Sequence, residues 1–200
     1  MKIAAIVPVK SLAEAKSRLA GELSPTQRAE LARAMLSHVL EVVIQSREVS
    51  SLAVISPNPG EIVLPPGVTS IKQDRHGLNN LLEQGREWAL REGADAIMVI
   101  FADLPLLSPF DISGMVRLGQ PRDSVVLAPD GRRVGTNVLL AHPVALARFA
   151  FGPDSYAKHT MLHQQVGAVI KIYSSTGTSL DIDTPDDLSY LEDRLLLEAS

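Results

Sequence analysis

The 200-residue sequence contains no cysteine, and this absence removes several kinds of chemistry at once. Disulfide bonds, thiolate nucleophiles and structural zinc sites built on cysteine are all excluded. Glycine-rich phosphate-binding motifs of the Walker or dinucleotide type are also missing from the sequence. Their absence argues against a P-loop NTPase and against a nicotinamide-dependent enzyme.

A surplus of positive charge is missing as well. The chain has 19 Lys and Arg residues against 23 Asp and Glu residues, which gives a formal net charge of −4. A general nucleic-acid binder is not indicated, because no basic surplus is there to neutralise a phosphate backbone. A small phosphorylated ligand needs only a few local cations and stays compatible with this balance.

Long hydrophobic runs do not occur in the sequence. The apolar run in MKIAAIVPVK, at the N-terminus, is too short for a signal peptide or a membrane span, and no other stretch approaches membrane length. We therefore expect a cytoplasmic protein that binds neither a membrane nor nucleic acid.

Short apolar runs typical of β-strands alternate with segments of helical periodicity. Strands are expected at residues 3–7, 52–55, 68–71, 96–101, 125–128, 136–141 and 169–173, and helices from residue 25, at 79–91, 108–118 and 154–165, and from residue 185. This alternation predicts an α/β domain with a mainly parallel sheet flanked by helices. No repeat or long linker interrupts it, so residues 1–200 are expected to form one domain.

Capping residues mark where two of these helices begin. In the first, Ser24 is expected as the N-cap, Pro25 as the first helical residue, and Gln27 as the partner that completes a capping box. In the second, Thr184 precedes Pro185, and Asp187 stands at the third helical position.

A carboxylate stands at the end of the most continuous strand, in AIMVIFADLPLL at residues 96–107. Ligands of open α/β sheets bind outside the carboxyl ends of the strands, which is where Asp103 is expected. A second acidic cluster, Asp181-Ile182-Asp183, precedes the last helix. Two carboxylates that end two strands indicate a hard cation such as Mg²⁺, completed by waters and substrate phosphates. A capped turn at Asp103 and a solvated turn at the second cluster remain the structural alternatives.

Cations follow the first strand, at the same expected edge of the sheet. Lys10 and Lys16 each offer a compact positive charge, and Arg18 offers a planar, forked one. Both kinds of group bind phosphate oxygens. The alternative is that AEAKSRLA forms a solvated helix with surface cations.

Two further stretches have the composition of a ligand site. Residues 134–137, VGTN, bring a glycine, a hydroxyl and an amide to the start of a strand. FGPDS, at residues 151–155, leads into a helix whose Ser155 and first amides are suited to an anion. Simple N-capping is the alternative. His159, one turn later on the same helix face, either contacts the same ligand or is structural.

Taken together these motifs resemble the 2-phospho-L-lactate or phosphoenolpyruvate guanylyltransferase family, which makes the activated phospho-acid for coenzyme F-420. The matching residues run in family order: IVPVK at 6–10, AKSRL at 15–19, LSPTQR at 23–28, GLN at 77–79, ADLPLL at 102–107, GTN at 135–137, FGPDSY at 151–156 with His159, and LDIDTPDDL at 180–188. The resemblance implies a Rossmann-like GT-A nucleotidyltransferase fold. PVKSLAEAKSRLA stands where the wider superfamily carries a glycine-rich loop, which argues against a sugar nucleotidyltransferase and a molybdenum-cofactor guanylyltransferase.

The resemblance also implies a reaction and a set of roles. GMP from GTP would be joined to phosphoenolpyruvate or 2-phospho-L-lactate, with release of pyrophosphate and with Mg²⁺ as cofactor. The implied roles are metal binding for Asp103 and Asp183; catalysis for Lys16, Arg18 and Asp103; nucleotide binding for Pro8, Val9, Lys10, Ser17, Gly77, Leu78 and Asn79; and acceptor binding for Thr136, Gly152 and Ser155.

Two other classes stay open at this stage. One is a different GT-A enzyme, either another nucleotidyltransferase or a glycosyltransferase. The other is a non-catalytic domain that binds a nucleotide and regulates a partner. A homodimer is the default expectation for the oligomeric state.

Overall fold

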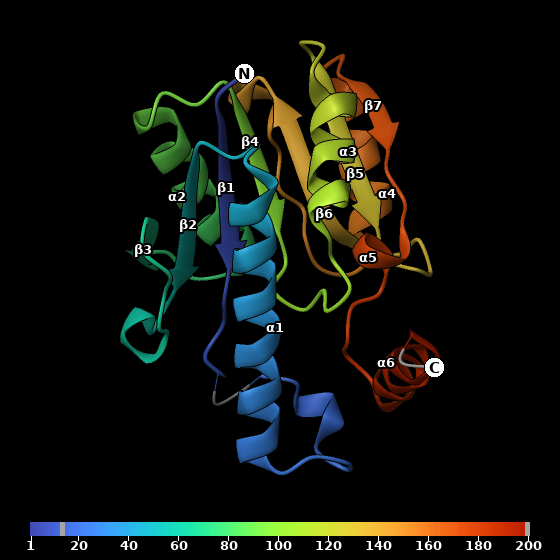
Figure 1. Ribbon diagram of the computed structural model, residues 1–200. Coiled ribbons are helices and arrows are strands. Elements are labelled where there is room, and N and C mark those ends of the chain that lie inside the picture. The colour runs from blue at the N-terminus through green and yellow to red at the C-terminus, as the bar shows by residue number, and fades with distance from the viewer. Residues whose placement is uncertain (13–14, 199–200) are drawn as a thin grey trace.

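A seven-stranded sheet occupies the middle of the structure, and helices cover both of its faces (Figure 1). The computed structural model describes residues 1–12 and 15–198, so the AKSRL segment is described from Ala15 onward, and Ala13, Glu14, Ala199 and Ser200 lie outside the described residues. The strands are β1 (Ile3–Pro8), β2 (Ser51–Ser56), β3 (Val68–Lys72), β4 (Ala96–Ile100), β5 (Ser124–Pro129), β6 (Thr136–His142) and β7 (Val169–Ile172). The α-helices are α1 (Pro25–Ser46), α2 (Leu78–Arg91), α3 (Pro109–Gly119), α4 (Ser155–Gln165), α5 (Thr176–Ser179) and α6 (Pro185–Glu198), and the 3₁₀ helices are η2 (Ser17–Leu19), η3 (Pro59–Glu61) and η4 (Val144–Leu146).

The strand order is β3-β2-β1-β4-β6-β5-β7, and only β6 runs against its neighbours. The carboxyl ends of the other strands therefore lie at one edge of the sheet. Because β6 is reversed, its first residue also lies at that edge, and Val138 pairs with Ile100 near the end of β4. The predicted single α/β domain with a mainly parallel mixed sheet is confirmed.

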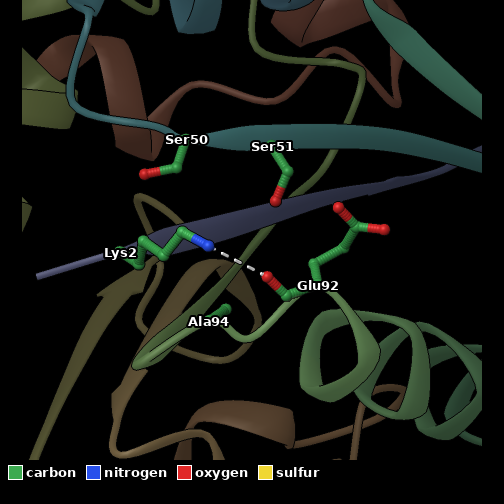
Figure 2. A pocket seen from close by; sticks show the side chains of 5 residues that line it. All are labelled: Lys2, Ser50, Ser51, Glu92 and Ala94. Atoms are coloured by element: carbon green, nitrogen blue, oxygen red, sulfur yellow. Dashed lines mark hydrogen bonds between the residues drawn. The ribbon is translucent and has the colours of Figure 1, made fainter.

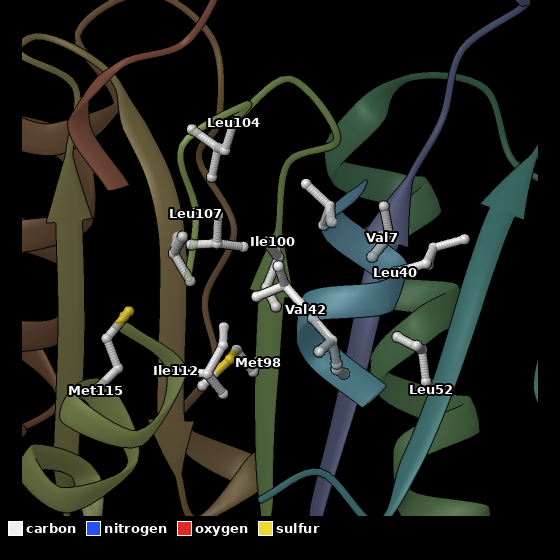
Figure 3. Close-up of a cluster of buried hydrophobic side chains, with 14 of the residues drawn as sticks. Val7, Leu40, Val42, Leu52, Met98, Ile100, Leu104, Leu107, Ile112 and Met115 are labelled. Carbon is white, nitrogen blue, oxygen red and sulfur yellow. The ribbon is translucent and has the colours of Figure 1, made fainter. Parts of the chain in front are cut away.

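Both faces of the sheet are buried, which explains why its strands have continuous apolar runs. On one face, Val7 and Met98 pack with Leu40 of α1 and Ile112 of α3 (Figure 3). On the other face, the alternate strand residues form a second cluster with Trp88 of α2. The fold thus has three layers, and the loops at the strand ends are left free to build a site.

The predicted helix starts are confirmed by their hydrogen bonds. The Ser24 Oγ accepts from the Gln27 amide at 3.3 Å, and the Ser24 amide donates to the Gln27 Oε1 at 2.9 Å. At α6, the Thr184 amide donates to the Asp187 Oδ2 at 2.7 Å, and the Asp187 amide donates back to the Thr184 Oγ1 at 3.4 Å. Each pair satisfies backbone donors that the first turn of a helix leaves without partners.

One segment differs from the prediction in a way that matters for the site. The short helix α5 stands between β7 and the acidic cluster, so Asp181 and Asp183 do not end a strand as predicted. A helix of four residues has no apolar periodicity from which it could be predicted. It is held instead by a local capping box between Ser175 and Thr178.

No helix within the described part of the chain is long and apolar enough to cross a membrane.

Candidate functional site

The direction of strand order reverses between β1 and β4, and in open α/β sheets a crevice forms outside such a switch point. Lys16 lies in the segment after β1, and Asp103 lies three residues after β4. The Lys16 Nζ donates to the Asp103 Oδ2 at 2.7 Å and to the Asp183 Oδ1 at 3.0 Å. The structure therefore brings three of the predicted residues into direct contact.

The backbone around Lys16 is shaped to point its side chain inward. Lys16 adopts a left-handed conformation, with φ of 54°, just before the 3₁₀ helix η2. Leu19, at the end of η2, is fully buried and fixes the segment, while Ser17 and Arg18 stay exposed. From Ala15 onward, the alternative of a solvated helix with surface cations is wrong for Lys16, whose side chain is only 9% exposed, and holds for Arg18, which is exposed on η2.

The charge of Lys16 is stabilised by its two carboxylate partners. Burial alone would lower the pKa of the ammonium, but the attraction and hydrogen bonds of Asp103 and Asp183 outweigh burial and raise the pKa above its usual value. Arg18 adds a second, looser positive charge, with its guanidinium 3.7 Å from the Asp183 Oδ2 and its side chain 72% exposed. Such an exposed pair contributes little to stability and leaves Arg18 free to reorient.

The acidic cluster is tied to the rest of the site through its backbone and through one amide. The Ile182 amide donates to the Asp103 carbonyl at 3.2 Å, and the Ile182 side chain is fully buried. The Asn137 Nδ2 donates to the Asp181 Oδ1 at 3.1 Å and to the Thr178 carbonyl at 3.0 Å. Asn137, the second residue of β6, thus holds the cluster beside Asp103.

Asp181 is a third carboxylate at this place, and no role of its own was predicted for it from the sequence. Burial raises its pKa to about 6, and the negative charges of Asp103 and Asp183 add to the rise, while the Asn137 hydrogen bond opposes it. Its position within DID was the available signal, since acidic residues two apart on an extended segment lie on the same side when the residue between them is buried.

The carboxylates fit a divalent cation by their number and their charge. Asp103 and Asp183 converge on a single ammonium, and with Asp181 they bring three acidic groups against Lys16 and the exposed Arg18. Within residues 1–12 and 15–198, no three acidic or histidine side chains surround a common point as a metal cage. An ion here would therefore take one or two protein carboxylates, the number typical of Mg²⁺, which completes its shell with waters and phosphates.

The predicted acceptor residues lie on the other side of the β6 start. Thr136 is buried, and its Oγ1 is 3.0 Å from the His159 Nδ1. Gly152 has a φ of +123°, a conformation that an L side chain rarely adopts, and Ser155 is buried as the first residue of α4. The structural alternative for His159 is confirmed: it is fully buried and packs edge-on against Phe151 with ring centroids 4.4 Å apart.

The amino end of α4 differs from both expectations for it. Asp154, not Ser155, is the N-cap, with a φ of 56° and without a side-chain capping bond, so Ser155 does not act as a capping residue. The Ser155 amide donates to the Gly152 carbonyl at 3.2 Å, and the Tyr156 amide donates to the Val134 carbonyl at 3.0 Å. These first amides are already used by the fold, so an anion here would meet the Ser155 side chain rather than those two N–H groups.

The GLN motif contacts the FGPDS segment, at residues 151–155, through Asn79. Gly77 is the exposed N-cap of α2 with a φ of 87°, and Leu78 is half-buried. The Asn79 Nδ2 donates to the Phe151 carbonyl at 3.1 Å, and the Phe151 amide donates to the Asn79 Oδ1 at 2.8 Å. Both ends of the Asn79 amide therefore hold the loop that carries Gly152.

The segment at the end of β1 offers mainly its backbone and one cation. Pro8 has no N–H, and the Val9 amide donates to the Ile55 carbonyl at 2.9 Å. Both side chains are buried, whereas Lys10 is exposed. A nucleotide at this edge would meet the exposed Lys10 ammonium.

A small pocket at the opposite edge of the sheet does not belong to this site. It has a volume of about 60 Å³ and is lined by Lys2, Ser50, Ser51, Glu92 and Ala94 (Figure 2). The Lys2 Nζ donates across it to the Glu92 carbonyl at 3.2 Å. These residues lie before or at the starts of β1, β2 and β4, and the volume is too small for a nucleotide.

Known proteins of one family are similar to this chain over nearly its whole length. A family model described as guanylyl transferase CofC-like matches residues 3–192. A phosphoenolpyruvate guanylyltransferase of Rubrobacter xylanophilus is 37% identical over 194 residues, covering 96% of this chain and 94% of the relative. A 2-phospho-L-lactate guanylyltransferase of Methanothermobacter thermautotrophicus is 31% identical over 191 residues, covering 94% and 83%.

Solved structures show the same fold at low sequence identity. A nucleotidyl transferase from Methanothermobacter thermautotrophicus superposes with a TM-score of 0.70 at 16% identity, covering 98% of this chain and 99% of that one. CMP:2-keto-3-deoxy-manno-octonic acid synthetase, complexed with CTP, gives a TM-score of 0.64 at 16% identity, covering 99% and 100%. The expected GT-A-like nucleotidyltransferase fold is confirmed.

Proposed function

Because the chain belongs to the CofC-like guanylyl transferase family, we propose that it joins GMP from GTP to a three-carbon phospho-acid and releases pyrophosphate. Phosphoenolpyruvate and 2-phospho-L-lactate are the two acceptors that the names of its relatives support. The observation that carries the proposal is the meeting of Lys16, Asp103 and Asp183 at the switch point of the sheet. Ammonium and carboxylate groups thus meet at the edge of the sheet where ligands of open α/β folds bind.

In this reaction an oxygen of the acceptor phosphate attacks the α-phosphorus of GTP. The new bond forms between that oxygen and the α-phosphorus, and the bond from the α-phosphorus to the bridging oxygen of pyrophosphate breaks. The attacking phosphate is already an anion, so no general base is required. The protein must instead position two repelling anions and neutralise the charge that develops on pyrophosphate.

Asp103 and Asp183 are the residues that would hold Mg²⁺, and Asp181 lies beside them. When bound, the ion supplies positive charge that screens the two reacting phosphates from each other. Lys16 would then be shared between the carboxylates and the triphosphate. The exposed Arg18 would neutralise charge on pyrophosphate, because its planar guanidinium suits phosphate oxygens.

The other residues of the site divide into a nucleotide side and an acceptor side. We assign nucleotide binding to Pro8, Val9, Lys10, Ser17, Gly77, Leu78 and Asn79, and acceptor binding to Thr136, Gly152 and Ser155. The Asn137 hydrogen bond to Asp181 joins the two sides, because it ties the start of β6 to the acidic cluster. Through its contact with Phe151, Asn79 also links the nucleotide side to the loop that carries Gly152.

Pyrophosphate release by the purified protein tests the proposal. The protein is incubated with GTP, Mg²⁺ and each of phosphoenolpyruvate, 2-phospho-L-lactate and 3-phosphoglycerate, with ATP and CTP as nucleotide controls. Release that requires GTP and one acid supports the reaction and names the acceptor. GTP binding without release for any acid would refute it in favour of a regulatory nucleotide-binding domain.

Asp103→Asn provides the matched test of the site. We expect it to lower turnover by roughly 10²–10³-fold, because it removes one anionic oxygen ligand from the reacting centre. Asp186→Asn is the control, since it makes the same chemical change at an exposed position in the first turn of α6. Near-normal turnover of Asp103→Asn would rule out its assigned role.

A further inference from the structure

Two histidines of α4 bind the backbone of the neighbouring loop in a regular pattern. The Ala150 amide donates to the His159 Nε2 at 3.0 Å, and the Arg148 amide donates to the His163 Nε2 at 3.2 Å. Both imidazoles are fully buried. Residues four apart on a helix are separated by about 6 Å, which matches two residues of extended chain, so the two rings meet alternate amides.

These contacts fix which nitrogen of each ring carries the proton. A backbone N–H can only donate, so the Nε2 that faces it is an acceptor and bears no hydrogen. A neutral imidazole then carries its hydrogen on Nδ1. The His163 Nδ1 donates to the His159 carbonyl at 2.7 Å, as this assignment requires.

The tautomer of His159 also fixes the direction of its hydrogen bond with Thr136. With its hydrogen on Nδ1, His159 donates to the Thr136 Oγ1 at 3.0 Å. A hydroxyl that accepts one hydrogen bond still has its own hydrogen to donate. Among the residues that the structure describes, no second hydrogen-bond partner of this hydroxyl is found.

We propose that His159 is a positioning residue for the acceptor, which turns the Thr136 hydroxyl into a hydrogen-bond donor directed at an anionic oxygen of the phospho-acid. This inference rests on the proposed function, since it assumes that Thr136 contacts the acceptor. Its consequence is chemical selectivity. A carboxylate or phosphate offers acceptor oxygens to this donating hydroxyl, whereas a ligand group that can only donate leaves the hydroxyl hydrogen without a partner.

The surroundings of His159 keep the ring in this state. Phe151 packs edge-on against it, and Asn79 fixes the Phe151 backbone from the other side. Burial and the neighbouring His163 lower the pKa of His159 to about 3. The ring is therefore neutral at neutral pH, and it acts by orientation and not by proton transfer.

Two replacements of His159 separate its two hydrogen bonds. The amide of Gln reaches the Nε2 position and can accept from Ala150, but it leaves nothing at Nδ1. The amide of Asn reaches the Nδ1 position and can donate to Thr136, but it leaves the Ala150 amide without a partner. His163→Gln is the matched control, because it alters an equally buried ring that binds Arg148 and makes no hydrogen bond to Thr136.

Steady-state kinetics with each substrate varied gives the first readout. We expect His159→Gln to raise the KM for the phospho-acid by roughly tenfold or more, with the KM for GTP nearly unchanged, because a hydrogen bond to an anion is weakened. His159→Asn and His163→Gln should change the acceptor KM by much less. In a Thr136→Val background, His159→Gln should have no further effect on it. Equal increases in both KM values, or additive effects in the double variant, would overturn the proposal.

Nitrogen-15 NMR of the histidine rings gives a second readout that does not depend on activity. The proposal requires a protonated Nδ1 and an unprotonated Nε2 at His159 in the wild-type protein. The opposite tautomer would overturn the proposal even if the enzyme is an active guanylyltransferase. Because the measurement uses the wild-type protein, it stays decisive if a His159 variant does not fold. If the wild-type protein turns over no phospho-acid, the proposed function and the acceptor role of Thr136 are both refuted. The tautomer then still shows whether the hydrogen bonds from Ala150 to His159 and from His159 to Thr136 exist.

Discussion

Acidification is expected to destabilise the protein through the buried histidines of α4, and the size of the effect follows from their surroundings. The pKa of His159 is lowered from 6.5 to about 3, first by burial and second by the charge that His163 would carry. Burial also lowers the pKa of His163, with help from Arg148, although the hydrogen bond to the His159 carbonyl works against this. In the unfolded chain both rings regain their ordinary pKa.

The sign of the effect is set by which state binds more protons. Between pH 6.5 and about 3, the unfolded chain binds one proton at His159 that the folded protein does not. The free energy of unfolding therefore falls as the pH falls, by about 1.4 kcal/mol per pH unit for one histidine. At pH 5, His159 alone should lower it by about 2 kcal/mol relative to pH 8. Above pH 7 the contribution is constant.

Denaturant unfolding of the wild-type protein and of His159→Gln isolates this contribution. Asp181 works in the opposite direction, since its pKa is raised to about 6, but it is present in both proteins and cancels in the difference. We expect the stability advantage of the wild type over the variant to shrink by about 2 kcal/mol between pH 8 and pH 5. Parallel curves over this range would refute the reasoning, because they would mean that His159 titrates alike in both states.

Two further changes test the contacts of the site. Lys16→Met leaves the Asp103 and Asp183 carboxylates without their shared cation and should lower the free energy of unfolding by about 1–3 kcal/mol in EDTA. The loss is smaller than for a fully buried ion pair, because the two carboxylates are 23% and 45% exposed. Thermal melts should show that Mg²⁺ restores more stability to the variant than to the wild type. Asn79→Ala removes two hydrogen bonds to the Phe151 backbone, so the KM for the phospho-acid should rise together with the KM for GTP, because Asn79 is assigned to the nucleotide and also holds the loop that carries Gly152; a rise in the KM for GTP alone would contradict this link.

Much of the fold could be predicted from the sequence because its signals are local. The strand at 96–101 is a continuous apolar run, since both faces of the sheet are covered, and the structure places β4 at Ala96–Ile100. Ser24 and Gln27 specify the start of α1 through hydrogen bonds within one turn. The position of Asp103 at the carboxyl end of β4 follows from the same local pattern, as does its place at the ligand-binding edge.

The parts that could not be predicted depend on contacts distant in sequence. Nothing near Lys16 indicates that its ammonium lies between Asp103 and Asp183, which are 87 and 167 residues away. The same is true of the hydrogen bonds from Ala150 and Arg148 to the α4 histidines, because the bend of the loop that presents these amides is a tertiary feature. A histidine pair four residues apart shows only that two rings share a helix face.

The reversed strand β6 explains how the two sides of the site come to lie together. Consecutive residues of a strand point to opposite faces of the sheet. Thr136 faces α4, where His159 donates to its hydroxyl, and Asn137 faces α5, where its amide holds Asp181 and the Thr178 carbonyl. Had β6 run parallel to β4, its end rather than its start would lie at this edge, and the GTN segment would be at the far side of the sheet. One antiparallel strand in a parallel sheet thus supplies, through two adjacent residues, a support for the acceptor side and a support for the acidic side.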